Sequence, residues 1–236
     1  MSGDVRIETV RDRIGAELVG MLFDDVWGVK NMVPTELIIA VTHTGGYASV
    51  ARRDGGVVGA AFGFLAHYHD GRASLHSHAT GVLARAANVG VGEALKIHQW
   101  QWASERGLEA VTWTFDPLVR RNAHFNLVKL GAVVVGYHED FYGAIHDGIN
   151  AQERTDRLMV SWAVGAAVPH GCHVQGSDDA ERIDIPDDIE AMRLGDRRAA
   201  HEWRERQRVA LRRCFESGRT IIGMDHEGRY VTGDPS

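Results

Sequence analysis

Four histidines surround one turn signal, Asp70-Gly71; they are His67, His69, His76 and His78. Imidazole titrates near neutral pH, so a histidine can take the proton of an amine nucleophile or, when neutral, bind a metal ion. Extended segments at 57–68 and 74–83 flank the turn and predict a β-hairpin. The hairpin would therefore bring four titratable rings close together.

A two-residue turn would fix the register of this hairpin. Because side chains alternate along a strand, that register places all four histidines on one face together with Ser74. The opposite face is expected to pack against helices, and it carries Phe62, Phe64, Leu75 and Ala79. Three roles stay open for the histidines: a solvated polar face, a metal site built from two His-x-His pairs, and acceptance of a proton by His78 or His76. No cysteine or glutamate joins the pairs, so we expect no metal.

A glycine-containing loop follows the hairpin and leads into a helix predicted over 91–106. Its residues are Ala87-Asn88-Val89-Gly90-Val91-Gly92. Free N–H groups at a helix N-terminus bind anionic groups, and glycines let such a group approach the backbone closely. The loop lacks the Gly-Lys-Ser/Thr of a Walker A motif, and the antiparallel strands before it disfavour a Rossmann motif. We interpret it as an anion-binding cradle, with a plain strand-to-helix turn as the alternative.

The remaining periodicity predicts a mixed α/β fold around these residues. A strand at 5–9, helices at 11–27 and from Pro34, and a strand at 47–53 come before the hairpin. A strand at 110–115, a helix at 122–130 and strands at 132–138 and 157–164 come after the loop. We expect one catalytic domain over residues 1–165.

Residues 166–236 predict a linker and an extension. A polar stretch follows Pro169, then a long helix at about 187–216 and a terminal hairpin at 219–223 and 229–232. The arginines between Arg193 and Arg213 alternate with acidic residues, which predicts a solvated helix with salt bridges rather than a nucleic-acid patch.

The composition limits the classes of function. The 236 residues carry a net charge of −6, which argues against a basic surface for nucleic acid. No apolar run is long enough to cross a membrane, and residues 1–9 carry no apolar signal-peptide core. Only Cys172 and Cys214 are present, so we expect the reducing cytoplasm rather than a disulfide framework.

The order of elements resembles the GNAT superfamily of acyl-CoA-dependent N-acyltransferases. A hairpin strand, a glycine loop and a helix are followed by a strand, a second helix and a strand, and the resemblance covers about residues 5–164. More narrowly, the segments at 113–118, 121–123, 140–143 and 155–157 look like a less-studied bacterial subgroup with a C-terminal extension. One branch of that subgroup is associated with N-succinylation of amino acids. The resemblance implies a mixed, mostly antiparallel twisted sheet flanked by helices, with a C-terminal helix and β-hairpin.

The resemblance also implies an acyl-CoA site. In the family, a Gln/Arg-x-x-Gly-x-Gly/Ala loop binds the pyrophosphate of coenzyme A; here Ala87 takes the leading position, and Arg85 lies two residues earlier. An asparagine of the second motif, here Asn122, contacts the cofactor. The implied cofactor-binding residues are Val82, Leu83, Arg85, Asn88, Val89, Gly90, Val91, Gly92 and Asn122.

For catalysis the resemblance implies direct attack of an amine on the thioester. His78 or His76 would take its proton, and backbone N–H groups near Val82 would polarise the carbonyl. The family tyrosine that protonates the departing thiolate corresponds to Leu127. The acid is therefore open, and Tyr142 is one candidate. Asp116 and Arg121 are candidates for binding the substrate.

These inferences predict transfer of an acetyl or succinyl-like group from acyl-CoA to a primary amine of a small molecule such as an amino acid. No metal, nucleic-acid or membrane partner is expected. The departures at Ala87 and Leu127 keep a non-catalytic acyl-CoA sensor or interaction protein as the alternative. A homodimer formed through the extension stays open.

Overall fold

The computed structural model describes residues 4–67, 71–143, 154–177 and 179–235. The chain forms two compact units, and each is considered separately. The first contains residues 1–113 and 163–168, and the second contains residues 114–162 and 169–236. The expected division into 1–165 and 166–236 follows sequence position rather than compactness, and it stays a prediction.

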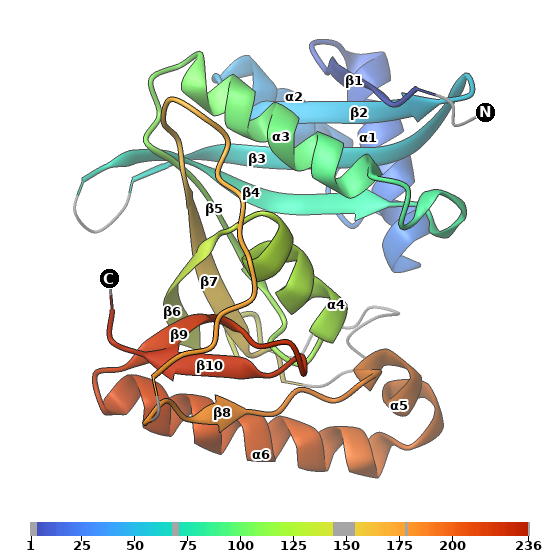
Figure 1. The fold of residues 1–236 in the computed structure, drawn as a ribbon. Helices are drawn as coiled ribbons and strands as arrows, with labels where there is room; N and C mark the ends of the chain where they lie inside the picture. The colour runs from blue at the N-terminus through green and yellow to red at the C-terminus, as the bar shows by residue number, and fades with distance from the viewer. Residues whose placement is uncertain (1–3, 68–70, 144–153, 178, 236) are drawn as a thin grey trace. The chain divides into compact units, whose positions relative to one another are not determined.

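The sheet of the first unit is mostly antiparallel, as predicted. Its strands pair in the order β1 (Arg6–Thr9), β2 (Tyr47–Arg53), β3 (Gly56–His67), β4 (Ala73–Val82) and β5 (Ala110–Phe115) (Figure 1). The last pair is parallel and short, and joins Ser74–His76 to Ala110–Thr112. Beyond His76, β4 continues to Val82, and its described residues there do not pair with β5.

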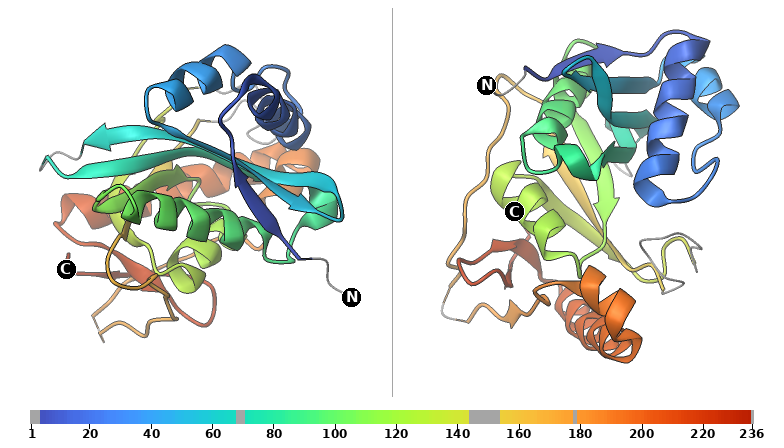
Figure 2. Two further views of the ribbon diagram at one scale, coloured as in Figure 1. Left: turned by 90° about the horizontal axis from the view of Figure 1, so that it is seen from above. Right: turned by 90° about the vertical axis from the view of Figure 1, so that its right-hand side faces the viewer.

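Helices cover both faces of this sheet. Helices α1 (Arg13–Trp27) and α2 (Thr35–His43) lie on one face, and α3 (Val91–Ser104) lies on the other (Figure 2). Asp12 caps α1 by accepting a hydrogen bond from Gly15 N. A hydrophobic core then forms between α1, α2 and the sheet, and its buried residues are Val10, Ala16, Val19, Leu22, Phe23, Val33, Ile38, Ala48, Val50, Ala60, Phe62 and Ala79.

The register of the β3–β4 hairpin differs from the prediction. His67 pairs with Ala73 and not with Ser74, so the predicted register is wrong. The predicted two-residue turn includes Asp70, which lies outside the described residues. Phe64 consequently pairs with His76 and shares its face. The register shifts once more where Phe62 pairs with Ala79 and Gly63 with Ser77, which leaves His78 as the extra residue of a β-bulge.

The second unit contains the end of the predicted core and the extension. Strands β6 (Val133–His138) and β7 (Arg157–Ala163, whose last residue belongs to the first unit) pair antiparallel. The predicted helix at 122–130 is a single α-turn, α4 (Arg120–Ala123), that widens into the π-helical segment η2 (His124–Lys129). The terminal hairpin is present as β9 (Thr220–Met224) and β10 (Tyr230–Gly233), and β8 (Arg182–Ile183) also pairs with β10.

The long helix of the extension is divided. Asp196 leaves the helical conformation after α5 (Ile189–Gly195), and its side chain caps α6 (Arg197–Glu216) by accepting from Ala199 N. The solvated character predicted for the arginine stripe is wrong for Arg193, Arg204 and Arg208, which are each at most 3% exposed. They are buried because acidic residues from elsewhere in the unit pair with them.

In the described part of the chain, no helix has both the length and the apolar character needed to cross a membrane.

Candidate functional site

The loop between β4 and α3 presents free backbone N–H groups. A short 3₁₀ turn, η1 (Ala84–Ala86), leads to the exposed residues Asn88, Val89 and Gly90. Gly90 precedes α3 with φ of +86°, a left-handed conformation that glycine adopts without strain. No side chain of the described residues caps α3, and α2 and α4 are uncapped in the same way, whereas aspartates cap α1, α5 and α6. The first amides of α3 can therefore bind an anion.

Arg85 and Asn88 complete this loop. Arg85 donates from Nη2 to Val57 O at 3.3 Å, which holds the exposed guanidinium beside β3. Asn88 has a φ of 61°, which asparagine tolerates better than most residues. A Cβ at Gly90 would meet no atom within 4 Å, so the space in front of the loop is open.

Strand β4 carries an irregular edge next to the loop. Leu83 N donates to Val58 O at 2.9 Å. Because N–H directions alternate along a strand, the N–H of Val82 points away from β3. The bulge at His78 needs Gly63 opposite it, since a Cβ there would lie 2.7 Å from the carbonyl oxygen of His76. Backbone groups on this edge of β4 are the donors that a carbonyl oxygen would need.

The structure brings His76 and His78 together on the face that carries Phe62 and Phe64. The Phe64 ring lies 5.2 Å from that of His76 and 5.9 Å from that of His78. The predicted separation of these phenylalanines from the histidines is therefore wrong. His67 falls on the opposite face by alternation, and His69 lies outside the described residues.

The two histidines differ in environment. His76 is half-buried, and its Nδ1 lies 3.1 Å from Thr112 Oγ1. Burial, His78 and Lys96 together lower the pKa of His76 to about 4. His78 is exposed, and desolvation of its ring by neighbouring atoms lowers its pKa from the ordinary value. Both imidazoles are therefore neutral at neutral pH, and His76 is the weaker base of the two.

The opposite side of β4 holds a buried lysine that the sequence analysis missed. Lys96 of α3 is 4% exposed, and its Nζ donates to Ser77 Oγ at 2.8 Å. The same Nζ lies 3.8 Å from the centre of the Trp113 ring, and Ser77 Oγ donates to Gln99 Oε1 at 3.0 Å. Burial lowers the pKa of Lys96 to about 7. The available signal was spacing, because Lys96 and Gln99 lie three residues apart on the helix face next to the buried Leu95.

Four predicted residues belong to the second unit, and Asp116 is the most constrained of them. Arg204 donates to both of its carboxylate oxygens at 2.9 and 2.8 Å, and Arg193 donates to one at 2.6 Å. Burial acts to raise the pKa of Asp116, but the two arginines outweigh it and hold the pKa well below its usual range. The carboxylate is thus occupied by structural ion pairs, and we assign it no substrate.

The other three are more accessible. Arg121 is exposed and pairs with Glu190 at 2.8 Å. Asn122 is half-buried within α4, and its backbone N–H donates to Val119 O. Tyr142 is 40% exposed, and its Oη lies 3.4 Å from Thr114 Oγ1. Their roles toward cofactor, substrate and thiolate stay predictions.

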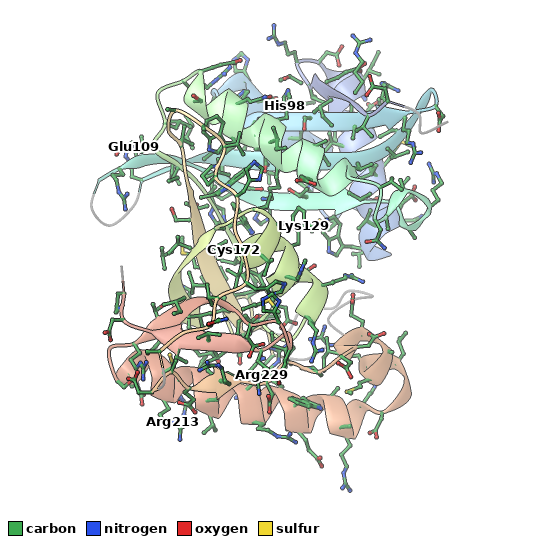
Figure 3. The ribbon with its side chains drawn as sticks, in the orientation of Figure 1. His98, Glu109, Lys129, Cys172, Arg213 and Arg229 are labelled. Atoms are coloured by element: carbon green, nitrogen blue, oxygen red, sulfur yellow. The ribbon has the colours of Figure 1, made fainter. Side chains whose placement is uncertain are left out.

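One cavity of the first unit is separate from these residues. It has a volume of about 580 Å³ and lies among the ends of β1, α2 and α3, with His98 and Trp102 in its wall. Figure 3 labels His98 on α3. Neither the cradle nor His76 and His78 line it. In the part of the chain that the structure describes, no group of three metal-ligating side chains is arranged to hold an ion.

Solved structures of acetyltransferases share the fold of this chain. The acetyltransferase of the GNAT family from Streptococcus pneumoniae matches 69% of this chain and 100% of its own, at 18% identity and a TM-score of 0.54. Arabidopsis thaliana Naa50, solved with the bisubstrate analogue CoA-Ac-MVNAL, matches 66% of this chain and 97% of its own, at 21% identity and a TM-score of 0.53.

The ribosomal-protein-S18-alanine N-acetyltransferase from Escherichia coli matches 70% of this chain and 96% of its own, at 12% identity and a TM-score of 0.52. No family model and no curated protein matches the sequence. The chain therefore has the fold of the GNAT acetyltransferases, as the resemblance implied.

Proposed function

We propose that this protein transfers an acyl group, acetyl or succinyl-like, from acyl-CoA to the primary amine of a small molecule such as an amino acid. One observation carries the proposal: the bulged strand β4 is followed, after η1 and the glycine loop, by the N-terminus of α3, which no side chain of the described residues caps. The fold supports acyl transfer from CoA to an amine in general. Neighbours such as the ribosomal-protein-S18-alanine N-acetyltransferase share only the fold with this chain, so they do not assign its acceptor. The small-molecule acceptor is therefore our own finer inference.

The loop residues fit a pyrophosphate. Its oxygens would accept from the free amides that follow Gly90, and the positive end of the α3 dipole favours their charge. Arg85 would add a positive charge at the exposed side of the loop. Ala87 cannot replace the Gln/Arg side chain of the family motif, so the backbone supplies most of this binding.

The chemistry then takes place on the irregular edge of β4. Backbone N–H groups there, including that of Val82, stabilise the developing oxyanion. Between the two histidines we assign proton acceptance to His78. A base with a pKa of about 4, as for His76, takes a proton poorly at neutral pH, while His78 is exposed to an incoming amine. His76 would position the neighbouring ring.

The cytoplasm is part of this proposal. Both cysteines are free, and Cys214 is buried while Cys172 is exposed, which suits a reducing compartment.

The test combines binding and turnover. Calorimetry measures the affinity for CoA, and mass spectrometry follows acylation of amino acids, other small amines and a peptide with a free N-terminus, using acetyl-CoA and succinyl-CoA. Turnover of small amines supports the proposal, and turnover of the peptide alone replaces the acceptor class. Binding without turnover across the panel favours the acyl-CoA sensor. Absence of CoA binding overturns the assignment.

A further inference from the structure

Lys96 is unusual among the lysines of this chain. The sequence contains three lysines, and Lys30 and Lys129 are exposed whereas Lys96 is 4% exposed. Among the described residues no carboxylate pairs with Lys96; its partners are the Ser77 hydroxyl and the face of Trp113. An unpaired cation in the interior is costly, and groups of this kind concentrate at functional sites.

The neighbours of Lys96 connect it to the proposed reaction. Ser77 immediately precedes the bulge residue His78 on β4. The side chain of Ser77 points to α3, while the rings of His76 and His78 lie with Phe64 on the other face. Lys96 also sits on the helix whose N-terminus forms the cradle, about one and a half turns further on.

We propose that Lys96 is the general acid that gives its proton to the CoA thiolate as the thiolate leaves. This inference rests on the proposed acyl transfer. The two proton transfers would then occur on opposite faces of β4. His78 would accept the proton of the amine on one face, and Lys96 would donate a proton to the sulfur from the other. It also accounts for Leu127, whose side chain has no proton to donate at the position of the family tyrosine.

The proton affinity of Lys96 suits this role. Its pKa of about 7 lies below the value of about 8.5 that is typical of a thiol, so transfer to the thiolate is favourable. An ordinary lysine, with a pKa near 10.4, would hold its proton more tightly than the thiolate. The titratable group that interacts with Lys96 across the packed strand is His76, and no carboxylate of the described residues raises the pKa of Lys96.

The step balances as follows. The nitrogen of a neutral amine forms the new C–N bond and loses one proton to His78. The C–S bond breaks, its electron pair stays on sulfur, and sulfur takes one proton from the Lys96 ammonium. The imidazolium then returns its proton to Lys96 through solvent, so the net products are the amide and free CoA.

The decisive experiment compares pH–rate profiles of the wild type, Lys96→Met and Lys96→Arg. In the wild type, kcat should fall as pH rises through about 7, because only the protonated lysine donates. Lys96→Met should lower kcat about 10²-fold and lose this falling limb. Lys96→Arg keeps a cation that does not release its proton, so it should fail as the acid. Lys30→Met is the matched control at an exposed lysine.

A second acyl donor separates acid catalysis from a structural role. A thioester of an acidic aromatic thiol leaves without protonation, so Lys96→Met should transfer its acyl group at nearly the wild-type rate. Equal losses with both donors, or an unchanged falling limb in Lys96→Met, would overturn the inference while leaving the proposed function standing.

A third measurement does not depend on turnover. Protein labelled at lysine Cε gives three lysine signals, and Lys96→Met assigns one of them. Titration of that signal near 7 supports the proposal, and titration near 10.5 overturns it. If the wild type binds no CoA and acylates no amine, the proposed function itself fails, and this signal still reports on Lys96 alone.

Discussion

Replacement of Lys96 by methionine should stabilise the folded protein while it impairs the reaction. Burial lowers the pKa of Lys96 from 10.5 to about 7. A shift of this size opposes the charged form by about 5 kcal/mol, at about 1.4 kcal/mol per pKa unit. Methionine occupies a similar volume without charge. The gain is below this upper bound, because methionine cannot donate to Ser77 and leaves its hydroxyl with one partner fewer.

The pH dependence gives the sharper signature. Below about pH 7, Lys96 is protonated in both the folded and the unfolded state, so the folded wild type bears the full cost. Between about pH 7 and pH 10.5 the folded state has lost the proton that the unfolded state still binds. Wild-type stability therefore rises by about 1.4 kcal/mol per pH unit in this window. The methionine variant lacks this dependence, so its advantage is greatest at low pH and shrinks as pH rises.

Urea unfolding, followed by tryptophan fluorescence from about pH 6 to about pH 9, measures the effect. The difference in unfolding free energy between Lys96→Met and the wild type should decrease by about 2–3 kcal/mol between pH 7 and pH 9. The Lys30→Met control should show no such change, because Lys30 is exposed. A difference that stays constant over this range would refute the reasoning, since it would mean that Lys96 titrates at its ordinary pKa.

Three further substitutions test the site and the second unit. Asp116→Ala should destabilise the protein by about 3–5 kcal/mol in urea unfolding, because it removes the carboxylate that pairs with two buried arginines. Unchanged stability together with a raised KM would instead indicate that Asp116 binds the substrate. Gly90→Glu should abolish CoA binding in calorimetry, whereas Gly55→Glu, at another open turn with positive φ, should not. His78→Ala should lower kcat about 10²-fold, and an unchanged pH–rate profile would move the base elsewhere.

Local sequence signals were sufficient for most elements of the first unit. The periodicity predicts a helix at 11–27, which the structure has as α1, and the predicted strand at 110–115 coincides with β5. The loop before α3 was recognisable for the same reason: Gly90 and the strand before it are close in sequence. Short-range patterns of this kind report backbone conformation directly.

The hairpin register could not be obtained in this way. Asp70-Gly71 favours a two-residue turn, but His67 pairs with Ala73, and the extra residue at His78 shifts the register again. A bulge depends on what packs against both faces of a strand, and here Gly63 allows it by leaving room for the carbonyl of His76. The proximity of His76 and His78 was predictable from their spacing, whereas their phenylalanine neighbours were not.

The burial of charged side chains could not be predicted from the sequence either. Arg204 and Asp116 are 88 residues apart, and Arg208 and Asp156 are 52 apart. A charged residue within a helix is therefore assigned to solvent unless its distant partner is known. Lys96 has no such partner among the described carboxylates, and it was not predicted to be buried because a single lysine in a helix most often extends into water.

The contrast between Lys96 and the buried arginines supports a functional reading of the lysine. Arg204 and Arg208 each pair with a buried carboxylate, at 2.8 and 2.7 Å, so their charge is compensated. A carboxylate paired with Lys96 in the same way would prevent the proposed proton transfer, because it would raise the pKa of the lysine above that of the thiol. A general acid for a thiolate needs a cation that holds its proton weakly, and an unpaired, desolvated lysine meets that need at a cost in stability.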